Sequence, residues 1–227
     1  MTATSSLPGS AGGRTPVFRF GYWLVLPSIV VSYAVCAAQG TANPSAVALL
    51  VQLATVALIL WVAEAKPGIR RAGMITLSTA AVAVTIVWLI GAQGHLLDIV
   101  LSGASMLAYL AAPVVIIAHQ VRKKHVDGQS LLAAIAAYIL VGMFFTFVYN
   151  FIALTSASPI FGDGQVESLT SQMFFSFTTL TTTGYGDKVP SGAGVQSVAI
   201  AEAIAGQLFL VIAVARVVSG WKPPTER

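Results

Sequence analysis

Six long apolar runs dominate the sequence and restrict the folds that it can adopt. They cover about residues 20–38, 46–63, 74–92, 96–120, 130–154 and 192–218. A helix needs roughly 20 apolar residues to cross the hydrocarbon core of a bilayer. Inside lipid the backbone of each run has to satisfy its own hydrogen bonds, which a helix does. The sequence therefore predicts an all-α membrane protein with six transmembrane helices.

The composition agrees with a membrane protein. The chain is 56% hydrophobic and 9% charged, whereas a soluble domain carries about 25% charged residues. The formal net charge is +4, but the basic residues sit in short groups between apolar runs, so nucleic acid is not an expected partner. A single cysteine, Cys36, cannot build a disulfide framework or a zinc site. Because no nucleophile–base set, metal cluster or phosphate loop is present, we expect neither an enzyme nor a cofactor.

Lysine and arginine predict the orientation, because they are enriched in cytoplasmic loops. With the N-terminus in the cytoplasm of a multi-pass cell-membrane protein, eleven of the 12 basic residues fall inside and only Lys188 falls outside. Both termini are then cytoplasmic. Arg122, Lys123 and Lys124 form a basic cluster between the fourth and fifth runs. This cluster either anchors the chain at the membrane surface or binds anionic lipid headgroups.

One segment, residues 167–180, does not fit the spanning pattern. It is semi-polar, aromatic and too short to cross a bilayer, and threonines and glycines follow it. These properties predict a re-entrant half-helix, which membranes tolerate only where protein or a water-filled cavity surrounds it. With the predicted orientation, this half-helix opens to the exterior.

The residues after the half-helix can build an oxygen cage for a cation. They read Thr181-Thr182-Thr183-Gly184-Tyr185-Gly186-Asp187. Backbone carbonyls replace the hydration shell of potassium if several consecutive ones point at one axis. Such a backbone needs positive φ at alternate residues, where glycine has no Cβ penalty. Gly184 and Gly186 alternate, Tyr185 can wedge outward between them, and one copy per chain requires four chains around the axis.

This segment resembles the selectivity filter of the tetrameric pore-loop potassium channel superfamily. The family's Thr-Val-Gly-Tyr-Gly falls on residues 182–186, with Thr183 in place of the valine. The resemblance implies that potassium is the permeant ion and passes through a homotetramer. It also implies a potassium site and an outer mouth. The site is the carbonyls of Thr182, Thr183, Gly184 and Tyr185 with the Thr182 hydroxyl; Gly186 completes the filter and Asp187 lies at the mouth.

The resemblance covers residues 131–218. The predicted domains are a cytoplasmic tail at 1–19, a four-helix sensor-like domain at 20–125, a pore domain at 126–218 and a short tail at 219–227. Many relatives carry a tryptophan on the pore helix that braces the aspartate after the filter. Here Phe174 and Phe175 offer no donor, so the support around Asp187 must differ.

Two positions on the last run have counterparts in the family's inner helix. Gly206 lies twenty residues beyond Gly186, where the family commonly has a hinge glycine; close helix packing is the alternative. Gln207, Leu210 and Val214 share one helical face and are expected to line the cavity, with plain core packing as the alternative.

Glu202 is an acid within the same apolar run. A charged side chain inside the membrane is energetically unfavourable unless it is paired or hydrated. At 100° per residue it points away from Gln207. We expect it to brace the filter from behind, with Thr178 or Ser176 as partner; a proton-sensitive gate is the alternative.

The predicted function is passive, potassium-selective conduction without steep voltage gating. Residues 96–121 contain no arginine or lysine, and their only formal charge is Asp98. A voltage sensor moves several arginines per subunit through the field. A potassium transporter subunit and a non-conducting regulatory subunit are the alternatives. Both usually have degenerate filters, and here the filter is intact.

Overall fold

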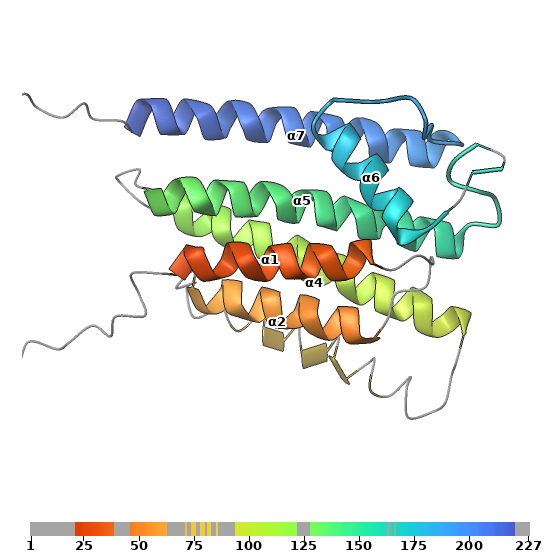
Figure 1. The fold of residues 1–227 in the computed structure, drawn as a ribbon, viewed down its shortest axis with the longest axis horizontal. Helices are drawn as coiled ribbons and strands as arrows, with labels where there is room; N and C mark the ends of the chain where they lie inside the picture. The colour runs from red at the N-terminus through yellow and green to blue at the C-terminus, as the bar shows by residue number, and fades with distance from the viewer. Residues whose placement is uncertain are drawn as a thin grey trace, which may run out of the picture.

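The computed structural model describes residues 21–38, 46–62, 94–121, 128–162, 164–165 and 167–220, with isolated positions between 71 and 85. Within these residues the named elements are all helices, which confirms the all-α prediction (Figure 1). They are α1 (Gly21–Ala37), α2 (Ala46–Val62), α4 (His95–Val121), α5 (Gly128–Thr155), α6 (Leu169–Leu180) and α7 (Ala193–Gly220). Most of the predicted third run lies outside the described residues, so the count of six spans stays a prediction.

Within the residues that the structure describes, three helices are long and apolar enough to cross a membrane. They are His95–Gln120, Gly128–Thr155 and Ala193–Arg216. The helices α1 and α2 are apolar as predicted, and each has 17 residues. At 1.5 Å per residue they are about 25 Å long, somewhat less than the hydrocarbon core.

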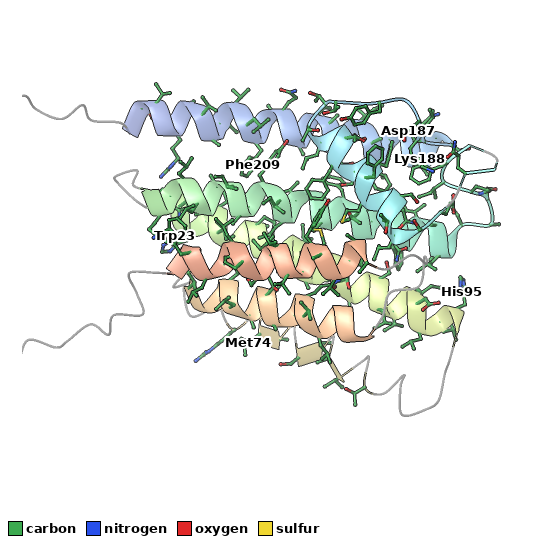
Figure 2. All side chains as sticks on the ribbon, in the orientation of Figure 1. Trp23, Met74, His95, Asp187, Lys188 and Phe209 are labelled. Carbon is green, nitrogen blue, oxygen red and sulfur yellow. The ribbon has the colours of Figure 1, made fainter. Side chains whose placement is uncertain are left out.

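The long helices lie side by side: α1 and α5 run in one direction, and α2, α4 and α7 run in the other (Figure 1). Along the bundle, α4 packs against α5, and α1 packs against both α2 and α5, while α6 lies between α5, α7 and α1. Trp23, near the start of α1, lies at one end of the bundle, and His95, Asp187 and Lys188 lie at the other (Figure 2). The loop after α6 therefore opens at the end opposite the start of α1.

Small residues of α4 permit its close contact with α5. Ser102 donates a hydrogen bond to the carbonyl oxygen of Phe147 (3.4 Å) and accepts one from the side-chain amide of Asn150 (3.1 Å). Two turns further along α4, the ring of Tyr109 stacks on that of Phe147 at 5.6 Å. Small and polar residues let helices approach closely where no hydrophobic force drives them together. These contacts join α4 to α5.

Local sequence determines where α6 begins and how closely it packs against α5. The Ser168 hydroxyl accepts a hydrogen bond from the backbone N–H of Ser171, and the Ser171 hydroxyl accepts one from the backbone N–H of Ser168. This capping box satisfies two N–H groups that a helix start leaves unpaired. Further along α6, the Phe177 ring packs directly against Gly142 of α5. A Cβ on Gly142 would lie only 2.7 Å from Phe177 Cζ. The glycine on α5 therefore allows α6 to lie close to it.

The first helix also touches α6 directly. The Thr170 hydroxyl donates to the carbonyl oxygen of Ala37 at 3.2 Å, and the Tyr33 ring meets the Phe177 ring edge-on at 5.8 Å. These contacts hold α6 between α1 and the last helix, and so fix where the chain leaves α6.

Candidate functional site

The C-terminus of α6 starts the filter segment, by which we mean residues 182–186. Thr181 is the C-cap. Beyond it, the N–H of Thr182 donates to the carbonyl of Thr179 (2.9 Å) and the N–H of Thr183 to that of Thr178 (2.8 Å). These two bonds are those of a Schellman motif, in which the residue after the C-cap is usually glycine in the left-handed region.

Here that residue is Thr182, with φ at +56°. Among the described residues it is the one non-glycine with positive φ. A β-branched side chain at positive φ is strained, at a cost of about 1–3 kcal/mol, and such strain concentrates at functional sites.

Positive φ recurs at every second residue of the filter segment. The values are +56° at Thr182, +51° at Gly184 and +81° at Gly186. The residues between them, Thr183 and Tyr185, do not have positive φ, so left-handed residues alternate with others along the segment. A Cβ added to either glycine would meet nothing within 4 Å. Within one chain, the backbone conformation and not the available space therefore requires these glycines, as the sequence predicted.

Hydroxyl groups and one amide surround Thr182, the first residue of the filter segment. The Thr182 hydroxyl donates to the carbonyl of Thr181 (2.7 Å) and accepts from Nε2 of Gln207 (3.2 Å). Thr181 and Thr183 share a hydroxyl–hydroxyl bond of 2.9 Å. The structure thus brings Gln207 of α7 to the first filter residue, although 25 positions separate Gln207 from Thr182 in the sequence.

The two phenylalanines that replace tryptophan have different places. Phe174 stacks on Tyr185 with ring centroids 5.7 Å apart. Phe175 is buried and meets Tyr149 and Phe161 edge-on at 5.1 and 5.2 Å. The stack supports Tyr185 by an aromatic face, since the phenylalanine has no donor to offer.

Just after the filter segment, Asp187 is exposed and its neighbour Lys188 is half-buried. The Lys188 ammonium donates to Oε1 of Gln165 at 2.7 Å and lies 5.7 Å from the centre of the Phe161 ring. These two partners were not predicted, because Gln165 lies in the loop before α6. They attach the end of the filter segment to that loop.

Glu202 lies behind α6 and is completely buried. Its Oε1 is 2.6 Å from the Ser176 hydroxyl, and its Oε2 accepts a hydrogen bond of 2.7 Å from the Tyr149 hydroxyl. The predicted partner Ser176 is confirmed, whereas Thr178 donates to the Phe175 carbonyl instead. Tyr149 was not predicted. One carboxylate therefore joins α5, α6 and α7.

Gly206 lies at the closest approach of α7 to α6. A Cβ there would overlap the carbonyl oxygen of Leu180 and lie 3.0 Å from its Cδ1. The Tyr138 hydroxyl donates to the same carbonyl oxygen at 3.1 Å. The close approach considered for Gly206 is thus present, while α7 continues through it as one helix. A hinge at Gly206 stays a prediction.

The predicted cavity-lining residues of α7 lie on the surface of the single chain. Leu210 and Val214 are exposed on α7 and border a groove of about 280 Å³ with Leu131 and Tyr138 of α5. Their role in lining a cavity stays a prediction. Arg122, Lys123 and Lys124 lie outside the described residues.

Comparison with known proteins bears on this helix–loop–helix unit. Residues 134–219 match the ion channel family (Ion_trans_2). The match spans most of α5, all of α6 and the filter segment, and α7 almost to its end.

This part of the chain is an ion channel domain. The resemblance to the pore-loop channel superfamily is therefore confirmed for the unit that holds the filter segment. No curated protein and no solved structure matches the chain.

Proposed function

We propose that four copies of this channel subunit surround one axis in the cell membrane and conduct potassium passively through the filter segment. The observation that carries the proposal is the alternation of positive φ at Thr182, Gly184 and Gly186. In this conformation the carbonyls of residues 182–185 face the axis and replace the hydration shell of potassium. The Thr182 hydroxyl adds one more oxygen at the inner end.

The end of α6 also favours a cation. A helix C-terminus carries a partial negative charge, because its last carbonyls have no intrahelical partners. The last turn of α6 leads directly into Thr181 and Thr182, and Gln207 bonds to the Thr182 hydroxyl. Four such helix ends would stabilise a partly hydrated cation below the filter. Glu202 would hold each α6 in place from behind through Ser176 and Tyr149.

Assembly follows from what one chain leaves uncovered. Only 11% of the most apolar stretch of α7 is buried within the single chain, against 56% of the corresponding stretch in α4 and 44% in α5. The filter segment itself is exposed on the single chain, with Tyr185 at 71%. Because each chain contributes one wall, closing the conduction path requires a ring of copies. The absence of arginine and lysine from α4 argues that this ring is not steeply voltage-gated.

The test is ion flux from liposomes that contain the purified protein. We expect potassium and rubidium to leave far faster than sodium, and the purified protein to be a homotetramer. Gly184→Ala places a Cβ at φ +51° and should abolish the flux or its selectivity. Gly194→Ala is the matched control, because its Cβ meets open space in the first turn of α7. A fully active monomer, or selective flux through Gly184→Ala, would refute the proposal.

A further inference from the structure

An apolar cavity of about 200 Å³ lies between α4, α5 and α7, in the half of the bundle away from the filter segment. Its apolar lining comes from Ile116, Ile117, Ala134, Ala137, Phe209 and Ile212. Figure 2 shows Phe209 between α5 and α7. The volume exceeds that of a cavity of roughly 150 Å³ that holds a benzene molecule. The space therefore suits an apolar chain of several carbons.

One end of this cavity is polar and positively charged. Arg216 and Gln120 line it, and the Arg216 guanidinium donates to the backbone carbonyl of Gln120. Both residues end apolar spans, Ala193–Arg216 and His95–Gln120. The polar end of the cavity is thus at the level where the hydrocarbon of a bilayer gives way to headgroups.

The Gln120 side chain gives an independent indication of a ligand. Its Oε1 and Nε2 are both buried, and neither bonds to a protein atom within the described part of the chain. A buried amide without partners is destabilising, so native proteins usually satisfy it. A polar group that enters the cavity beside Arg216 would supply the missing partner.

We propose that the cavity binds an anionic phospholipid from the adjacent leaflet. One acyl chain occupies the apolar part, between Phe209 and Ile116. The phosphate lies at Arg216, and the Gln120 amide donates to a phosphate or ester oxygen. This site is separate from the filter segment and does not depend on which ion the channel conducts.

The charge at the polar end decides which amphiphile binds. An acyl chain gains little by leaving the bilayer for this cavity, because lipid tails are as apolar as its lining. Selection must therefore come from the headgroup. A basic residue near a membrane surface contributes about 1 kcal/mol to the binding of anionic lipid, which corresponds to roughly a fivefold preference. We expect phosphatidylglycerol to bind about five times more tightly than phosphatidylcholine.

Native mass spectrometry of the purified full-length protein, titrated with each of these two lipids, measures the preference. Arg216→Gln should abolish it, and Arg216→Lys should keep most of it because the charge remains. The matched control is Arg71→Gln, since Arg71 is an exposed cation that does not line the cavity. A preference that survives Arg216→Gln, or that disappears equally in Arg71→Gln, would overturn the proposal.

A second variant tests the acyl chain. Ala134→Leu adds side-chain volume to the wall of the cavity and should reduce the number of phosphatidylglycerol molecules retained per subunit. Unchanged retention would show that the chain lies elsewhere, and that a neighbouring subunit or nothing fills the space. Lipid binding is read out directly, so a protein that fails to conduct potassium could still pass this test, and the reverse.

Discussion

Replacing Gly206 by alanine tests how closely α7 passes the end of α6. The new Cβ would overlap the Leu180 carbonyl oxygen, which the Tyr138 hydroxyl also contacts. Because the obstacle is backbone, a change of side-chain rotamer cannot relieve it, and either α7 or the last turn of α6 has to move. Overpacking of this kind costs about 1–3 kcal/mol. Alanine gains up to about 1 kcal/mol over glycine in helix propensity.

Gly194→Ala on the same helix is the control that separates the cost of overpacking from the gain in helix propensity. Its Cβ meets nothing within 4 Å, so it reports helix propensity alone. We therefore expect Gly206→Ala to be about 1–3 kcal/mol less stable than Gly194→Ala, measured as the free energy of unfolding in mixed micelles. Leu180→Ala should not rescue Gly206→Ala, because the backbone oxygen remains. Equal stability of the two alanine variants would refute the packing at Gly206 described above.

Two further predictions concern Glu202 and α4. Glu202→Leu should lower the free energy of unfolding by about 1–3 kcal/mol, because Tyr149 and Ser176 lose their shared partner. Glu202→Gln should stay close to wild type, since an amide can accept from Tyr149 and donate to Ser176; equal losses in both variants would argue that the charge itself matters. A conductance–voltage curve should have a slope of fewer than about four charges per tetramer, because α4 contains no arginine or lysine, and a steeper curve would contradict this.

The sequence predicted the helices well where membrane physics leaves little choice. An apolar run within lipid has to be helical, and the ends of α4, α5 and α7 agree with the predicted ranges to within about two residues. The half-helix α6 was predicted because its polar and aromatic residues are too few to cross a bilayer. Positive φ at Gly184 and Gly186 was predicted because glycine is the residue that adopts it without strain.

The missed features depend on tertiary contacts or on strain. Thr182 adopts positive φ against the preference of a β-branched side chain, so its propensity gave no indication of the Schellman motif. Tyr149 lies in an apolar run 53 positions before Glu202, where an aromatic residue is typical of packing. A completely buried acid needs donors on both of its oxygens, and this requirement is the signal that points to a second partner besides Ser176.

The reversal potential of single channels in a planar bilayer tests the central claim most directly. With potassium on one side and sodium at equal concentration on the other, the account predicts discrete currents that reverse far toward the potassium equilibrium potential. These currents should disappear or lose selectivity in Gly186→Ala, because the alanine would have to adopt the positive φ of +81° that Gly186 has. A reversal potential near zero in the wild-type protein would contradict a potassium-selective filter at residues 182–186.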